Sequence, residues 1–291
     1  MKTMTGNVVI LLSICYCSLA LYAGENQAIP KGIAHRGLTS VKYPENTLPA
    51  FEVACKSKFW GIEYDVRETY DKKLVICHDE DVSAASDGKG RICELRLKEL
   101  LRLNFGVNKN MSNVQIPQFD EVFDLCHANG KMQIIEIKDG SDTSDAICFK
   151  LGLRERIPEG KGVCDVVAEK IKKCHAEKTT RIGCFTILIL LYVHDFYPEI
   201  QTHLFIGDRN VDKYIKRKKI SVKKGSDAEK CLASVKSVGV KSRYLTKDIV
   251  KGFHDRGLSV DAWGISSPKE YERMKSIGVD SVTLEDATFL K

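Results

Sequence analysis

The sequence predicts an α/β protein built as one TIM (β/α)8 barrel, with a small insertion after the second strand. Three observations support this fold class. Short apolar runs alternate with amphipathic helical segments along most of the chain. About eight of these runs are far enough apart for a crossover helix, and 291 residues suit one such barrel. The alternative, an open doubly wound sheet, lacks a Gly-x-Gly-x-x-Gly motif after the first strand.

The chain begins with a predicted signal peptide over residues 1–23. Lys2 provides a positive start, residues 8–21 are mostly apolar, and Ala20 and Ala23 offer small residues for cleavage. The apolar stretch is shorter than the roughly 20 residues that a membrane-spanning helix needs. We therefore favour cleavage over an uncleaved signal anchor, and expect a secreted, extracellular protein.

Cysteine usage fits an exported chain. Eleven cysteines are present, and removing Cys15 and Cys17 with the leader leaves nine. An oxidising compartment favours disulfides, and the odd number leaves at least one thiol unpaired within the chain. Cys148 and Cys164 are the candidate pair, whereas the alternative is that most of these cysteines are small buried hydrophobic residues. No Cys-x-x-Cys motif supports a zinc or thioredoxin-like site.

Residues 24–291 are predicted to form a single domain of alternating elements. We expect strands over residues 32–35, 61–66, 74–77, 132–137, 181–185, 201–206, 238–242, 258–263 and 280–284. Helical patterns cover residues 47–57, 119–129, 164–175, 246–256 and 268–277. The run at 74–77 follows 61–66 too closely for a crossover helix, so these two runs should form a hairpin extension. Residues 79–118 are polar and long for a βα connection, and are the predicted insertion.

Charged side chains gather where the first two strands end, and in a barrel those ends form the mouth that carries the active site. His35 and Arg36 lie at the end of the first strand. Glu63 and Asp65 are two residues apart on the second strand, so they share one face, while the residues between and beside them face the helices. Two inward carboxylates side by side require a positive partner.

The same spacing recurs on the next parallel strand, where Glu136 and Lys138 add a third carboxylate and a fixed positive charge. His78 adds a second imidazole at the end of the hairpin. A hard divalent cation, Mg²⁺ or Ca²⁺, prefers such an all-oxygen site. Taken singly, each residue has an ordinary structural explanation, because acids often pair with Arg or Lys. Together they favour metal-assisted acid–base attack on an anionic phosphoester.

At these positions the sequence resembles the glycerophosphodiester phosphodiesterases. The resemblance runs from about Ile33 to Leu284 and rests on ordered motifs, namely His35-Arg36-Gly37, Pro44-Glu45-Asn46-Thr47, Ala50-Phe51, Glu63-x-Asp65, His78-Asp79, Ile116-Pro117, Glu136-x-Lys138 and Asp261-Ala262-Trp263. It implies a TIM barrel that hydrolyses glycerophosphodiesters, such as glycerophosphocholine, to an alcohol and glycerol 3-phosphate. It also implies one bound divalent cation.

The resemblance further implies a role for each matched residue. The metal ligands would be Glu63, Asp65 and Glu136, the general base and acid His35 and His78, and the phosphate-binding residues Arg36 and Lys138. Trp263 would pack against the glycerol or head group, although a place in the barrel core is equally consistent with the sequence. In the mechanism that the family implies, the glycerol 2-hydroxyl attacks phosphorus and water then opens the cyclic phosphate.

Three departures from the family pattern bear on the choice of substrate. No Arg follows His78-Asp79 within residues 81–86, the Ser-Phe of many members is Cys184-Phe185, and the usual Thr-Asp-x-Pro ending reads Thr283-Leu284-Glu285-Asp286. A lysophospholipase D-like or sphingomyelinase D-like enzyme on the same barrel, and a non-catalytic barrel, therefore stay open as alternatives. An apolar groove beside the phosphate site would support the lipid substrates.

The charge balance predicts few partners beyond a small-molecule phosphodiester. The chain has 45 Lys and Arg against 39 Asp and Glu, a net charge of +6, which does not indicate nucleic acid binding. A basic stretch from Lys213 to Lys224 is compatible with transient contact with an anionic membrane surface, and a solvated surface is the simpler interpretation. Nothing in the sequence predicts an obligate protein partner.

Overall fold

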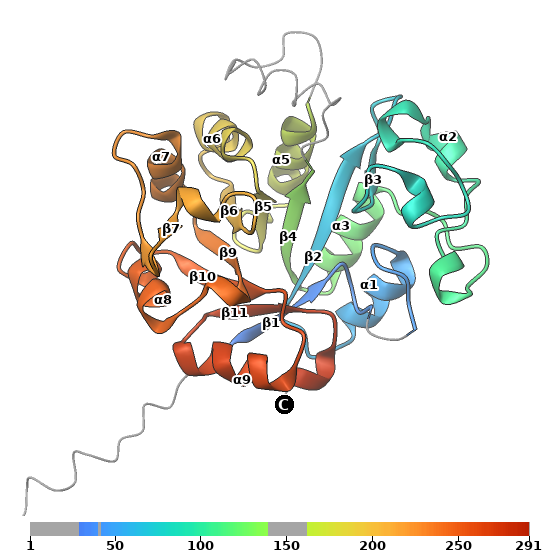
Figure 1. Cartoon of the computed structure of the whole chain (residues 1–291). Coiled ribbons are helices and arrows are strands. Elements are labelled where there is room, and N and C mark those ends of the chain that lie inside the picture. The colour runs from blue at the N-terminus through green and yellow to red at the C-terminus, as the bar shows by residue number, and fades with distance from the viewer. Residues whose placement is uncertain (1–28, 40–41, 139–161, 291) are drawn as a thin grey trace, which may run out of the picture.

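The fold is given by a computed structural model that describes residues 29–39, 42–138 and 162–290. Eight parallel strands pair in sequence order, and the last pairs with the first, which closes a barrel. They are β1 (Lys31–His35), β2 (Gly61–Glu68), β4 (Met132–Ile137), β5 (Thr180–Cys184), β6 (Gln201–Ile206), β9 (Ser237–Lys241), β10 (Ser259–Trp263) and β11 (Ser281–Leu284). Helices surround the strands (Figure 1), so the predicted TIM barrel is confirmed.

Five helices correspond to predicted segments. They are α1 (Leu48–Cys55), α3 (Phe119–Ala128), α5 (Val163–Lys173), α8 (Lys247–His254) and α9 (Pro268–Ile277). Within the described residues, three further helices were not predicted, namely the one-turn α2 (Leu97–Leu100), α6 (Ile187–Phe196) and α7 (Asp227–Ser234). The α6 segment is apolar on nearly every side, so it shows no helical period. For α7 a signal was present, because Ser226 accepts a hydrogen bond from the backbone N–H of Glu229, an N-cap with Glu at the third helical position.

Successive side chains of β2 point alternately toward the helices and into the barrel, so the strand contributes to both the apolar core and the charged cluster. Ile62, Tyr64 and Val66 are fully buried in the main apolar cluster between the strands and the helices, where the Tyr64 ring meets Phe51 of α1 edge-on at 5.8 Å. The side chains between them point into the barrel. The predicted orientation of this strand is therefore observed.

Two hairpins extend the barrel. The first is formed by β3 (Leu74–Ile76), which pairs antiparallel with the end of β2 as predicted. The second consists of β7 (Ile215–Lys216) and β8 (Lys219–Ile220), and lies in the connection from β6 to α7.

Residues 79–118 fold beside β3 around a second apolar cluster, which contains Val82, Ile92 and Leu100 and also Val75 of β3. This segment contains α2 (Leu97–Leu100) and three short 3₁₀ turns, Val82–Ala84, Ile92–Glu94 and Val107–Lys109. Three more 3₁₀ turns occur at Val211–Lys213, Ser242–Tyr244 and Ala287–Phe289.

Several expectations fall beyond the described residues. The predicted signal peptide and Cys148 of the predicted Cys148–Cys164 pair lie outside them, so both stay predictions. Within the described ranges, no helix combines the length and the apolar character needed to cross a membrane.

Candidate active site

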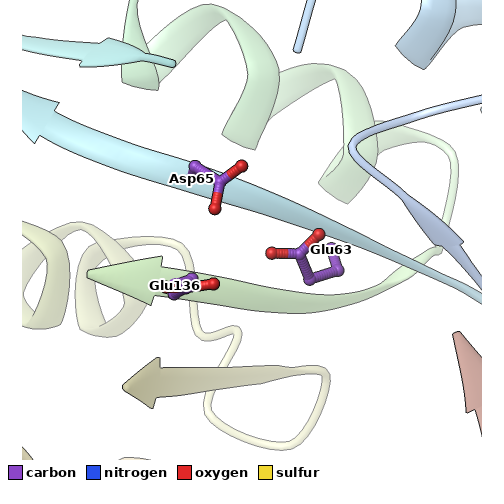
Figure 2. Close-up of side chains that lie close together, drawn as sticks. All are labelled: Glu63, Asp65 and Glu136. Carbon is purple, nitrogen blue, oxygen red and sulfur yellow. The ribbon is translucent and has the colours of Figure 1, made fainter. Parts of the chain in front are cut away.

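Three buried carboxylates meet at the mouth of the barrel. Glu63 and Asp65 come from β2, and Glu136 comes from β4 directly beside Asp65 in the strand register. Each places a carboxylate oxygen within 4.8 Å of the other two, and at most 8% of any of these residues is exposed. Figure 2 shows the three side chains along these two neighbouring strands. The i, i+2 spacing thus brings together the three residues expected to form an all-oxygen site.

Two cations hold these carboxylates. Lys138, just beyond β4, places Nζ 2.9 Å from Asp65 Oδ1 and 2.7 Å from Glu136 Oε1. Arg36, just beyond β1, places Nε 3.3 Å from Asp65 Oδ2, while its Nη1 donates to Glu45 Oε1 at 2.8 Å. Both predicted phosphate-binding residues therefore lie against the predicted metal ligands, and both side chains are largely buried.

The turn after β1 adds Asn46, for which the sequence predicted no role in the site. Asn46 donates from Nδ2 to Asp65 Oδ2 at 2.7 Å, and its backbone N–H donates to the carbonyl of Arg36. Arg36 and Asn46 both have φ of 55°, in the left-handed region. Such strained backbone persists where the surroundings fix it and is common at functional sites. The Pro44–Thr47 motif thus supports Asp65 as well as leading into α1.

Charge and burial set the protonation of the cluster. Burial raises the pKa of Glu63 well above its ordinary value, and Asp65 and Glu136 add to the effect. Burial and Asp65 raise the pKa of Glu136 to about 7 against the opposing effect of Lys138. Burial would also raise the pKa of Asp65, but Lys138 and Arg36 together hold it below its usual range. When all three carboxylates are ionised, they face only two fixed cations, and a divalent cation bound through oxygen donors alone would neutralise the excess negative charge.

Both predicted catalytic histidines lie at this mouth, each about one third exposed and each with Nδ1 beside a carboxylate. His35 Nδ1 is 3.5 Å from Glu285 Oε1, and its Nε2 is 3.9 Å from Glu63 Oε2. His78 Nδ1 is 3.0 Å from Asp79 Oδ1, and burial together with Lys138 lowers the pKa of His78. A carboxylate at Nδ1 fixes the tautomer that leaves Nε2 available for proton exchange.

Trp263 lies on β10, across the barrel from β4 in the strand order, and does not belong to the charged cluster. Its Nε1 donates to the carbonyl of Gly239 at 3.1 Å, and its ring meets Phe185 edge-on at 6.0 Å. Phe185 in turn stacks on Phe205 at 5.1 Å. Trp263 therefore belongs to an aromatic wall that is only partly buried, consistent with either predicted role.

A groove of about 930 Å³ leads away from this aromatic wall. It begins at Phe185 and Thr186, and its apolar lining continues through Ile187 and Leu188 of α6 to Val222. Its far side is formed by polar and charged residues of the connection from β6 to α7 and of the first position of α7, namely Asp212, Lys213, Lys216, Ser221, Lys223, Ser226 and Asp227. The groove brings together connections that are far apart in the sequence.

Comparisons with known proteins agree with the fold and the motifs. A family model described as the glycerophosphoryl diester phosphodiesterase family matches residues 35–287. A glycerophosphodiester phosphodiesterase of Caldanaerobacter subterraneus is 26% identical over 258 residues, which cover 87% of this chain and 93% of the relative. A glycerophosphodiester phosphodiesterase of Bacillus altitudinis is 27% identical over 256 residues, covering 87% and 93%.

Solved structures give the same fold at lower identity. The glycerophosphodiester phosphodiesterase of Agrobacterium tumefaciens superposes with a TM-score of 0.67 at 16% identity, covering 89% of this chain and 98% of that chain. A phosphodiesterase of Oleispira antarctica, solved with the product sn-glycerol-3-phosphate, superposes with a TM-score of 0.69 at 20% identity, covering 88% and 92%.

Proposed function

The chain belongs to the glycerophosphoryl diester phosphodiesterase family, and from this premise we propose that it hydrolyses glycerophosphodiesters, such as glycerophosphocholine, to an alcohol and glycerol 3-phosphate. It is accordingly a phosphoric diester hydrolase. One observation carries the proposal: Glu63, Asp65 and Glu136 converge at the barrel mouth with Arg36 and Lys138 against them. A substrate with one anionic phosphate suits a site that combines fixed cations with a carboxylate cluster for a divalent metal.

The three carboxylates would hold the cation, either Mg²⁺ or Ca²⁺. When bound, it would supply Lewis-acid stabilisation of charge on the phosphoryl oxygens. Lys138 has three N–H donors and uses two of them on Asp65 and Glu136, which leaves one for a phosphoryl oxygen. The Arg36 guanidinium also keeps donors beyond those facing Asp65 and Glu45.

The histidines would move the protons. His35 takes the proton of the glycerol 2-hydroxyl as that oxygen attacks phosphorus, and the bond from phosphorus to the alcohol oxygen breaks. His78 donates a proton to the departing alcohol oxygen. Water then opens the cyclic phosphate, with the two histidines exchanging roles. Glu285 and Asp79, beside the two Nδ1 atoms, would keep each ring oriented during the exchange.

A direct assay tests this function. Choline and glycerol 3-phosphate are measured from glycerophosphocholine, with and without EDTA, for the wild type, His35→Ala and the control His127→Ala, an exposed position on α3. We expect EDTA to abolish turnover, Mg²⁺ or Ca²⁺ to restore it, and His35→Ala to lower kcat/KM by about 10²–10⁴-fold. Hydrolysis insensitive to both EDTA and His35→Ala would refute the assigned site. Absence of turnover on any phosphodiester with metal present would favour a non-catalytic barrel.

The groove favours a second candidate substrate, a lysophospholipid. Phe185 links the aromatic wall to the groove, whose volume lies within the range of pockets that bind small molecules. With the phosphodiester at the carboxylates, a single acyl chain could lie along Ile187, Leu188 and Val222. The same groove would accept the chain of a sphingolipid.

The variant Ile187→Asp separates the two substrates, because an acidic residue in the first helical turn of α6 is compatible with folding but not with a hydrocarbon chain. We expect it to lower kcat/KM for lysophosphatidylcholine and to leave glycerophosphocholine hydrolysis unchanged. Equal effects on both substrates, or no turnover of the lysolipid by the wild type, would remove this candidate.

Export is part of the proposal. Removal of a signal peptide at about Ala20 or Ala23 would place the enzyme outside the cell, where disulfides form. N-terminal sequencing and thiol counting of protein recovered from culture medium test both points. An intact Met1 on the recovered protein would contradict cleavage.

A further inference from the structure

The β7–β8 hairpin and its flanks carry most of the net charge of the molecule. Residues 212–227 contain seven Lys or Arg and two Asp, a net charge of +5 in a chain whose total is +6. The seven cations are exposed, and within the described residues none of them forms an ion pair. They are Lys213, Lys216, Arg217, Lys218, Lys219, Lys223 and Lys224.

The hairpin that carries these cations is packed against the rest of the fold. Tyr214 and Ile215 are buried at the base of the hairpin, and the backbone N–H of Ser221 donates to the carbonyl of Tyr214 at 2.8 Å. Ile220 packs on Gly252 of α8, where a Cβ would lie only 3.0 Å from the Ile220 side chain. The basic side chains are thus displayed together on a packed element of the fold.

The hairpin sequence works against its own stability. Arg217 and Lys218 form a two-residue turn with φ of 48° and 59°, a backbone that strongly prefers Asn-Gly. Lys216 and Lys219 pair directly across the two strands, and like charges in that position repel. Four consecutive cations at the tip are therefore maintained against both backbone strain and repulsion, which points to a role in binding.

We propose that this hairpin docks the protein onto an anionic phospholipid bilayer. The negative surface potential of such a bilayer attracts clustered Lys and Arg over a Debye length and requires no specific geometry. The groove extends to the base of the same hairpin, where Lys213 and Lys216 line it together with half-buried Leu188 and Val222, so a lipid surface would meet both charged and apolar groups. Single-stranded nucleic acid fits less well, because the one aromatic residue of the hairpin, Tyr214, is fully buried and offers no stacking face.

Vesicle co-sedimentation of the mature chain tests the proposal. We expect binding to phosphatidylcholine vesicles that contain about 30% phosphatidylserine, little binding to pure phosphatidylcholine, and loss of binding at about 0.5 M salt. The variant Arg217→Asn/Lys218→Gly removes two cations and supplies the residues that this turn prefers, so it should fold at least as well as the wild type. Its partition coefficient should be about 25-fold lower, at about fivefold for each cation.

The matched control is Lys56→Gln/Lys58→Gln, which removes two exposed cations from the α1–β2 connection at the opposite end of the barrel. We expect it to bind vesicles like the wild type. Equal losses in both double variants, unchanged binding of the hairpin variant, or binding to duplex DNA but not to vesicles would overturn the proposal. Glycerophosphocholine hydrolysis should be the same in all three proteins, so failure of membrane docking is distinguishable from failure of the proposed activity.

Discussion

Lys138 is the cation most closely engaged with the buried carboxylates, and Lys138→Met removes its charge while keeping most of its length. Its Nζ is 2.7 Å from Glu136 Oε1 and 2.9 Å from Asp65 Oδ1, and only 10% of the side chain is exposed. The substitution leaves Asp65 with Arg36 and Asn46 as its remaining partners. Glu136 loses its only ion-pair partner among the described residues.

The expected loss of stability in Lys138→Met follows from these distances. At an effective dielectric constant of about 20, each contact is worth about 6 kcal/mol of direct attraction. Most of this is offset by desolvation of the ammonium group, and removal of one partner from a buried pair costs about 3–5 kcal/mol. Because the pKa of Glu136 is already about 7, that carboxyl can take up a proton once Lys138 is gone. We therefore expect Lys138→Met to lower the free energy of unfolding at pH 8 by about 3 kcal/mol, the lower end of that range. This corresponds to a decrease in Tm of about 6–12 °C.

The stability deficit of Lys138→Met should become smaller as the pH falls. A carboxyl whose pKa is higher in the folded than in the unfolded chain gains stability as pH falls through the folded pKa. Loss of Lys138 raises the folded pKa of Glu136 further, so the variant should recover part of its deficit between pH 8 and pH 6. Thermal unfolding of EDTA-dialysed protein at both pH values measures this.

Lys131→Met is the matched control at the other end of β4. Lys131 Nζ donates to the backbone carbonyls of Phe59 at 2.6 Å and Ser57 at 3.2 Å, and has no carboxylate partner among the described residues. Its loss should cost about 1–2 kcal/mol with no change between the two pH values. Equal destabilisation by Lys138→Met and Lys131→Met at pH 8 would contradict the role assigned to the Lys138 charge. So would a stability deficit of Lys138→Met that is as large at pH 6 as at pH 8.

Three further predictions address the metal site and the barrel interior. Glu63→Gln should weaken Mg²⁺ or Ca²⁺ binding at least about tenfold in calorimetry, because it removes one of three charged ligands; unchanged affinity would place the cation elsewhere. Gly239→Ala should lower the free energy of unfolding in urea by about 1–3 kcal/mol, since a Cβ there would overlap His203 Nε2 and lie 2.9 Å from Phe205 Cδ1; a neutral result would mean that these rings can shift. Burial lowers the pKa of His203 to about 3, so stability should fall by up to about 1.4 kcal/mol per pH unit below pH 6.5; His203→Gln should remove that slope, and an unchanged slope would contradict it.

The strands and the charged cluster were predictable because they depend on local rules. Strand bounds agree with the predicted runs to within two residues, and Glu63, Asp65 and Glu136 converge because an i, i+2 pair shares a face. The pairing of β4 with β2 in a fixed register then brings Glu136 beside Asp65. The chemical roles of these residues stay predictions until activity is measured.

The supporting residues were harder to predict, because they come from connections rather than strands. Asn46 reaches Asp65 only through a left-handed backbone that no hydrophobic pattern encodes, although Asn tolerates it better than most residues. Glu285 approaches His35 from just beyond the last strand, at the unspecified position of the Thr-Asp-x-Pro motif, so the motif predicts no role for it. The groove joins segments near residues 185 and 222, whose proximity depends on the packing of α6 and α7.

The mouth is divided into two unlike halves, and the division orients the substrate. The carboxylates and cations lie on or just beyond β1, β2 and β4, whereas Phe185, Phe205 and Trp263 form the wall on or just beyond β5, β6 and β10. A phosphodiester bound by its phosphate in the charged half would therefore direct one of its two substituents toward the aromatic wall and the groove beyond it. The departure at Cys184-Phe185 falls on this second half, with Phe185 itself lining the groove. Selection among substituents should accordingly reside in the β5–α6 and β6–α7 connections, which can vary without disturbing the charges that act on phosphorus.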